Sequence, residues 1–69
     1  MAKPNMIKLA RFTKGLTQAE LAEELEVTTA TIQNWEKERS VPTIKDANRL
    51  ADFLELDKGK VLEFFGKVE

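Results

Sequence analysis

Three residues, Glu26-Val27-Thr28, separate two stretches of this chain that both carry the apolar periodicity of a helix. Because so short a link allows only a sharp turn, the two helices, expected at residues 18–25 and 29–37, have to cross and pack against each other. Ala22 is small at the point where the helices would touch. The apolar side chains that would fix the crossing are Leu21, Leu25, Val27, Ile32 and Trp35.

The second of these helices has an unusual outer face. Ile32 and Trp35 share its inner face, whereas the opposite face is polar, uncharged and built from small or amide side chains. The residues of this opposite face are Thr29, Ala30, Gln33 and Asn34. A helix face that needs only to be soluble usually carries Lys and Glu, so the pattern indicates that this face has a function.

Helix start and stop signals divide the rest of the chain. Asn5, Thr28 and Asp57 are suited to cap helix N-termini, and Thr17 with Glu20 fits a capping box. No segment shows the alternation of a strand. The sequence therefore predicts a single, compact all-α domain over residues 1–69, with five helices at about residues 6–14, 18–25, 29–37, 44–54 and 58–65.

The core expected from this periodicity comprises Leu21, Leu25, Val27, Ile32, Leu50 and Leu54. In the fourth helix the apolar positions at helical spacing are Ile44, Ala47, Leu50, Ala51 and Leu54. The first helix has a second apolar stripe, and we expect its Leu9 and Phe12 to pack against the last helix, at residues 61–65. That contact would bring the two ends of the chain together.

Composition excludes several kinds of function. The 69 residues include no Cys and no His, which removes thiolate and imidazole metal ligands and the commonest general base. No glycine-rich phosphate loop or obvious carboxylate pair is visible, so the sequence predicts no enzyme, no catalytic residue, no metal and no cofactor. It contains no signal peptide and no membrane-spanning run, so we expect a cytoplasmic protein without a membrane partner. The net charge of −1 does not by itself indicate a nucleic-acid partner, but contact with DNA uses only one face.

From Leu16 to Leu56, the sequence LTQAELAEELEVTTATIQNWEKERSVPTIKDANRLADFLEL resembles the phage-repressor and Cro-like helix-turn-helix domains, often called Xre type. The pieces that match are Arg11, the entry GLTQAELA, the helix TIQNWE, Pro42 and the segment RLADFLEL. The resemblance extends over about residues 7–62. It implies a five-helix, lambda-repressor-like fold with the helix-turn-helix at the second and third helices.

This resemblance also implies roles for individual residues. The chain would be a sequence-specific, double-stranded DNA-binding transcriptional regulator, a repressor, whose helix 29–37 reads the major groove. The base-reading residues would be Thr29, Ala30, Gln33 and Asn34. The residues that contact the DNA backbone would be Gln18, Thr28, Lys37 and Arg39. Arg11 and Glu36 would form an ion pair that joins the first helix to the third.

The family usually binds two half-sites, so the expected partner of a homodimer is a two-fold symmetric operator. Amide and methyl groups on the reading face favour A·T base pairs there. On this assignment, replacing Gln18 by Ala should weaken binding to all DNA sequences alike.

Two positions depart from the family pattern. Glu26 and Glu38 stand where the family often has Gly, the first in the turn and the second just after the TIQNWE helix. A non-Gly residue with positive φ costs about 1 kcal/mol, so we expect a slightly strained turn. Glu38 also places an acid near the DNA phosphates, which weakens binding.

Alternatives stay open on function and on assembly. The fold could serve as a protein-interaction module that does not bind DNA, such as an antitoxin or adaptor domain, which the net negative charge and Glu38 favour. Dimerisation could use Phe64 or Val68, or a part of a longer regulator. The acidic run of the second helix would be a solvated face, a surface that keeps the protein off random DNA, or a docking site for a basic partner. Its members are Glu20, Glu23, Glu24 and Glu26.

Overall fold

The computed structural model describes residues 5–65, with side chains up to residue 64, and these residues form helices joined by short links. The helices are α1 (Met6–Thr13), α2 (Gln18–Leu25), α3 (Thr29–Glu36), α4 (Ile44–Leu54) and α5 (Lys58–Phe65). No strand occurs in this part of the chain. The predicted all-α fold is confirmed, and each helix begins and ends within one residue of its predicted bounds.

Each helix begins at a side-chain cap. In all five, a side-chain oxygen just before the first turn accepts a hydrogen bond from the backbone N–H three residues further on. The capping residues are Asn5, Thr17, Thr28, Thr43 and Asp57. At α2 the capping box is complete, because Glu20 Oε1 also accepts from the Thr17 N–H at 2.8 Å. These local contacts explain why the helix starts could be predicted so closely.

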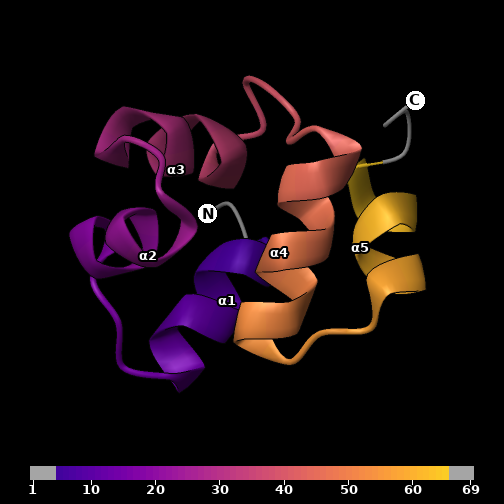
Figure 1. Cartoon of the computed structure of the whole chain (residues 1–69), viewed down its shortest axis with the longest axis horizontal. Helices are drawn as coiled ribbons and strands as arrows, with labels where there is room; N and C mark the ends of the chain where they lie inside the picture. Colours follow the sequence, from indigo (N-terminus) through magenta and orange to yellow (C-terminus); the bar gives the residue numbers. More distant parts are fainter. Residues whose placement is uncertain (1–4, 66–69) are drawn as a thin grey trace.

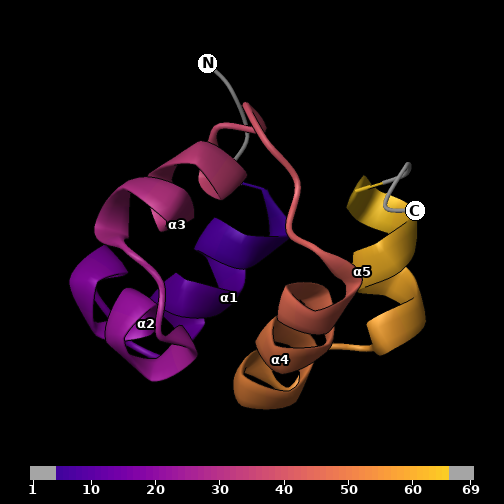
Figure 2. The same cartoon turned by 45° about the horizontal axis from the view of Figure 1, so that its top comes forward.

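The helices pack around one core. Figure 1 shows α2 and α3 side by side at one end of the molecule and α5 at the other, with α4 between them. The view of Figure 2 gives the same order, and α1 also packs against α3. The buried side chains are Ile7, Leu21, Ala22, Leu25, Ile32, Trp35, Ala47, Leu50, Ala51, Leu54 and Val61. Val27, in the turn between α2 and α3, is half-buried against this core.

One expectation about packing is wrong. Leu9 and Phe12 are each 55% exposed, so α5 does not cover them. The reason is geometric, because α4 lies between α1 and α5 and takes up the buried face of α5. Instead, the Phe12 ring lies beside the Arg11 guanidinium, 4.8 Å from the ring centroid. Ile44, the first residue of α4, follows the apolar spacing of this helix but is 47% exposed, whereas Ala47, Leu50, Ala51 and Leu54 are buried.

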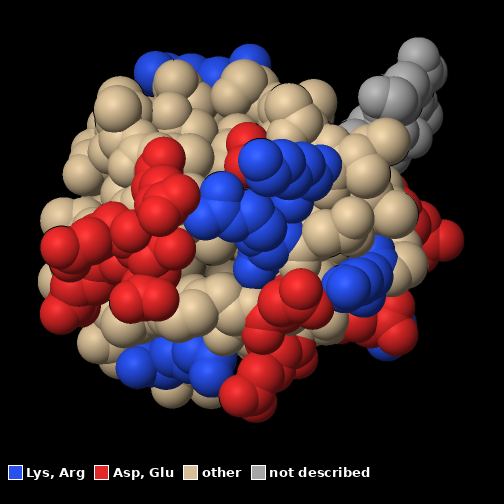
Figure 3. Space-filling model, in the orientation of Figure 1, with Lys and Arg blue, Asp and Glu red and all other residues tan. Residues whose placement is uncertain are grey.

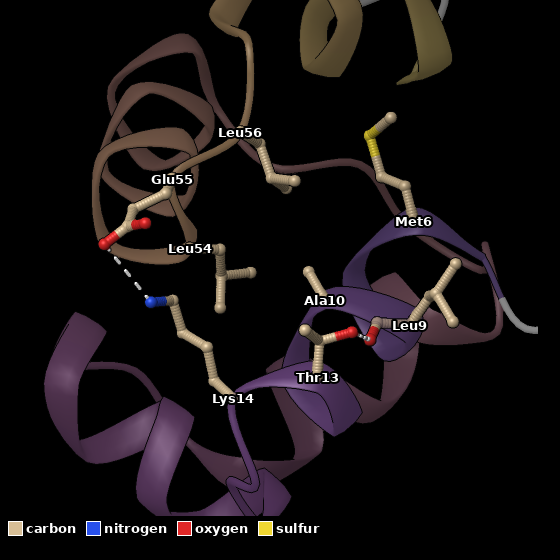
Figure 4. Close-up of a pocket in the computed structure, with 8 residues that line it drawn as sticks. All are labelled: Met6, Leu9, Ala10, Thr13, Lys14, Leu54, Glu55 and Leu56. Carbon is tan, nitrogen blue, oxygen red and sulfur yellow. Dashed lines mark hydrogen bonds and ion pairs between the residues drawn. The ribbon is translucent and has the colours of Figure 1, made fainter.

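A pocket of about 350 Å³ lies between α1 and the end of α4. Figure 4 shows Met6, Leu9 and Ala10 on one side, facing Leu54 and Leu56 on the other. At one edge, Lys14 Nζ is 3.4 Å from Glu55 Oε2. Val68, considered above as a dimer contact, lies outside the described residues.

Four helices end in the same hydrogen-bonded turn, with a left-handed residue just after the last turn. At the end of α2, the Val27 N–H donates to the Ala22 carbonyl at 3.0 Å, and equivalent bonds close α1, α3 and α4. This pattern is the Schellman motif, whose left-handed position is usually Gly. The left-handed residues here are Gly15 (φ 71°), Glu26 (φ 60°), Glu38 (φ 59°) and Glu55 (φ 58°). The left-handed conformation expected at Glu26 is confirmed, and Glu55 adopts the same conformation, which the sequence did not predict.

Candidate nucleic-acid interface

The two faces of α3 differ sharply in burial. Ile32 and Trp35 are 0% and 3% exposed, and Asn5 Nδ2 donates a hydrogen bond of 2.9 Å to the Trp35 carbonyl. On the other side, Ala30 and Gln33 are exposed and the remaining two predicted base-reading residues, Thr29 and Asn34, are half-buried. The four polar residues therefore form one continuous face on a helix that is fixed from behind.

The start of α3 is held by two hydroxyl groups. Thr28 Oγ1 accepts from the Thr31 backbone N–H at 3.1 Å and lies 3.0 Å from Thr31 Oγ1. The Thr28 hydroxyl, predicted to contact the DNA backbone, is therefore also the cap that begins the helix. Sequence reasoning missed Thr31. Its place three residues after a capping Thr is the signal that could have found it.

Arg11 and Glu36 join α1 to α3 through a buried ion pair. Arg11 Nε is 2.7 Å from Glu36 Oε2, and Arg11 Nη2 is 3.2 Å from Glu36 Oε1. The two side chains are only 8% and 3% exposed. Arg11 Nη1 also donates to the Leu16 carbonyl at 2.9 Å, so the link into α2 is held by the same guanidinium.

The structure links Gln18, which was predicted to contact the DNA backbone, to Gln33, which was predicted to read bases. Gln18 Nε2 donates to Glu36 Oε1 at 3.0 Å, and Gln33 Nε2 donates to Gln18 Oε1 at 3.3 Å. Gln18, the first residue of α2, thus connects the ion pair to the outer face of α3. The sequence gives no direct signal for this contact, because it depends on the side-chain rotamers of residues on different helices.

Comparison with known families decides the class of this arrangement. The helix-turn-helix family model HTH_3 matches residues 7–61. The chain belongs to the helix-turn-helix family. The match identifies a Cro/C1-type, Xre-like DNA-binding domain of transcription regulators, a family that is regulatory rather than enzymatic. A comparison with curated proteins and one with solved structures found no match.

In this helix-turn-helix domain the charges are unevenly distributed. Figure 3 shows acidic atoms gathered over α2, and basic atoms gathered near the first half of α4 with acidic atoms over its end. The four glutamates of the acidic run are all exposed. At the end of α3, Lys37 and Arg39 are exposed on either side of Glu38, which is also exposed. The edge predicted to contact phosphates therefore carries two cations and one anion.

Within residues 5–65, no helix is long and apolar enough to span a bilayer. Across the same range, no group of three or more His, Cys, Asp or Glu side chains is placed to hold a metal ion.

Proposed function

We propose that this chain is a cytoplasmic, sequence-specific transcriptional regulator, a repressor, that reads the major groove of double-stranded DNA with α3. The observation that carries the proposal is the uncharged polar face of α3, exposed on a helix whose opposite face is buried. A major groove is wide enough to admit one helix, and base edges are read by hydrogen-bonding and methyl groups rather than by net charge.

Each residue type on that face has a partner among the bases. The amides of Gln33 and Asn34 can bond to adenine, and the methyl groups of Thr29 and Ala30 can meet the thymine methyl. Backbone contacts at the edges come from Gln18, Thr28, Lys37 and Arg39. We therefore expect the read positions of the operator to be rich in A·T base pairs.

The operator is expected to be two-fold symmetric and bound by a homodimer. A single module of this size buries only about 600 to 1,000 Å² on DNA, which rarely gives tight specific binding. Two modules on half-sites about one DNA turn apart double that contact and match the symmetry of a dimer to the symmetry of the site.

The test is selection of bound sequences from a random duplex DNA library at about 0.1 M salt, an ionic strength at which charge contacts are partly screened. We expect a two-fold symmetric sequence with half-site centres about 10 base pairs apart. If no sequence is enriched although circular dichroism shows that the domain is folded, the proposal is contradicted for the isolated domain.

A second selection with two copies joined by a flexible linker separates two reasons for such a failure. Enrichment only with the joined copies would show that dimerisation limits binding. No enrichment in either form would favour the protein-interaction module. Salt dependence gives an independent check, because DNA affinity falls steeply with salt as counterions are released.

A further inference from the structure

The outer face of α1 carries two large apolar side chains that the described residues leave uncovered. Leu9 and Phe12 are each 55% exposed. Residues three positions apart on a helix are neighbours, so the two side chains form one apolar surface rather than two isolated spots. Scattered single apolar residues are normal on a soluble protein, whereas a contiguous apolar patch marks a site of interaction. Leu9 and Phe12 therefore indicate a contact surface on the outside of α1.

A pocket beside this surface has the size and the lining to receive an aromatic ring. Leu9 also lines the pocket of about 350 Å³ between α1 and the end of α4, opposite Leu54 and Leu56 (Figure 4). At about 30 Å³ for each water-sized group, this volume has room for about a dozen of them, more than a phenyl ring needs. Phe12 of the same chain does not line the pocket, and its ring lies beside Arg11 instead. An apolar knob and an apolar recess thus lie next to each other on one surface.

The charges at the knob and at the recess have opposite signs. Lys8 Nζ lies 5.7 Å from the centre of the Phe12 ring, and Lys8 has no ion-pair partner among the side chains that the structure describes. At the rim of the pocket, the Glu55 side chain is 80% exposed although Lys14 Nζ is 3.4 Å from its carboxylate. If Phe12 of one molecule enters the pocket of another, its Lys8 comes with it to the rim where Glu55 stands. The surface is therefore complementary to itself in shape and in charge.

We propose that this surface binds a second copy of the chain across a two-fold axis. The surface, here called the α1–α4 face, comprises Lys8, Leu9, Phe12, the pocket and Glu55. Phe12 of each molecule fills the pocket of the other, and Lys8 of each pairs with Glu55 of the other. An isologous contact lets one surface supply both the knob and the recess, and it makes every interaction twice. The inference goes beyond the proposed function, since it concerns association between two molecules and involves no DNA.

The α1–α4 face points away from α3. Successive residues of a helix are about 100° apart, which places Leu9 nearly opposite Arg11 on α1. Arg11 pairs with Glu36 at the end of α3. Two copies joined through the α1–α4 face therefore keep both of their α3 outer faces exposed. The contact centres on one ring and one pocket in each molecule, at the small end of specific interfaces, so we expect a dissociation constant of about 1 to 100 µM.

Sedimentation equilibrium of the purified chain without DNA, from about 1 µM to about 1 mM, measures this association. We expect a monomer–dimer equilibrium in which Phe12→Ser raises the dissociation constant about 30-fold or more, the effect of losing an aromatic residue that fills a partner's pocket. The matched control is Val41→Ser, because Val41 is 50% exposed but lies in the link between α3 and α4, outside the α1–α4 face. It should leave the dissociation constant unchanged. Thermal unfolding checks that each variant is folded.

A pair of charge reversals tests how the two copies are arranged. Lys8→Glu alone would place two acids together and Glu55→Lys alone would place two cations together, so each variant should dimerise about 10-fold more weakly. In an equimolar mixture each variant supplies the charge that the other lacks, and we expect association about as strong as that of the wild type. Glu55→Lys also breaks the contact with Lys14 of its own chain. Mixing two chains cannot restore a contact within one chain, so recovery in the mixture reports the contact between copies.

Three results would overturn the inference. A chain that stays monomeric up to about 1 mM would leave the α1–α4 face to another occupant, such as a further part of a longer chain. Equal dissociation constants for Phe12→Ser and Val41→Ser would place the contact elsewhere. A charge-reversed mixture that associates no better than its components would exclude the two-fold arrangement. None of these results bears on the selection of DNA sequences, so failure of this inference and failure of the proposed function are distinguishable.

Discussion

The two faces of α3 have different physical roles although they belong to one short helix. The inner face, with Ile32 and Trp35, is closed by α1 and α2 and contributes to the core. The outer face, with Thr29, Ala30, Gln33 and Asn34, contributes little to packing. Inner residues are chosen by volume and outer residues by hydrogen-bonding groups. Stability and base choice should therefore respond to different substitutions.

Glu36 lies where the two faces meet. Its carboxylate receives Arg11 from the buried side and Gln18 from the exposed side. Burial of an ion pair adds little net stability when compared with apolar packing, but removing one partner is costly. The Arg11–Glu36 pair therefore fixes the position of the residue at which the two faces meet. Substitutions on each face test whether stability and base choice are independent of each other.

The largest effect is expected on the inner face. Ile32→Ala should lower the free energy of unfolding by about 2 to 5 kcal/mol, because it removes buried methyl groups and leaves a cavity. That loss is comparable to the whole stability of many small domains, about 5 kcal/mol. Urea unfolding followed by the fluorescence of Trp35, the single tryptophan, measures it.

Ile32→Val is the matched control for this substitution. It removes one methylene and should cost about 0.5 to 1.5 kcal/mol. If Ile32→Val keeps wild-type base preference at saturating protein, the inner face acts on DNA only through folding. A changed preference in this folded variant would break the separation of the two faces.

On the outer face we expect a smaller effect, and one that appears in binding. Asn34→Ala should cost about 1 to 3 kcal/mol of binding at its preferred base pair and should flatten the preference there. Its free energy of unfolding should change by less than about 0.5 kcal/mol, because little packing is lost. Fluorescence anisotropy with four duplexes, one for each base, measures the first quantity. Equal weakening of all four duplexes would show that Asn34 contacts only the backbone.

The smallest effect concerns the turn that joins α2 to α3. Glu26→Gly should raise the free energy of unfolding by about 0.5 to 1 kcal/mol, since Gly adopts a φ of 60° without the strain of a side chain. The Glu26–Arg49 pair that it removes is 3.6 Å long and the Glu26 side chain is 81% exposed, so its loss should matter little. The midpoint of thermal unfolding measures the change, and base preference should stay at the wild-type level.

Two control variants isolate the cause. Glu26→Ala removes the same ion pair but keeps the left-handed strain, and it should therefore not stabilise the protein. Glu23→Gly places Gly inside α2 and should lower the free energy of unfolding by about 0.5 to 1 kcal/mol. A gain from Glu26→Ala as large as that from Glu26→Gly would assign the effect to charge rather than to backbone conformation.

The parts of the fold that depend on local sequence could be predicted closely. The caps at Asn5, Thr17 and Thr28 act on backbone groups three residues away, so a short window of sequence contains everything needed to find them. The core residues of α2 and α3 also follow from spacing, because a helix with one apolar face has one way to bury it. These signals gave the helix bounds and the inner face of α3.

Contacts between distant residues were harder to predict. Leu9 and Phe12 have the periodicity of a buried stripe, yet whether a neighbour covers them depends on where α4 lies. Ile44 has the apolar spacing of the α4 core residues, yet it is 47% exposed at the first position of the helix. The Gln18–Glu36 and Gln18–Gln33 contacts join residues 18 and 15 positions apart, and they depend on rotamers that no periodicity encodes.

The glutamates at the left-handed ends of α2, α3 and α4 also bear on how long the protein survives in a cell. Proteases remove molecules that are transiently unfolded, and a difference of 1 to 2 kcal/mol can change abundance by roughly several-fold. We therefore expect a regulator that keeps Glu at these positions to be cleared faster than its glycine variants. On the proposed function, operator occupancy then falls sooner once synthesis stops, which a comparison of the half-lives of the wild type and Glu26→Gly would test. Equal half-lives would show that turnover does not follow the strain.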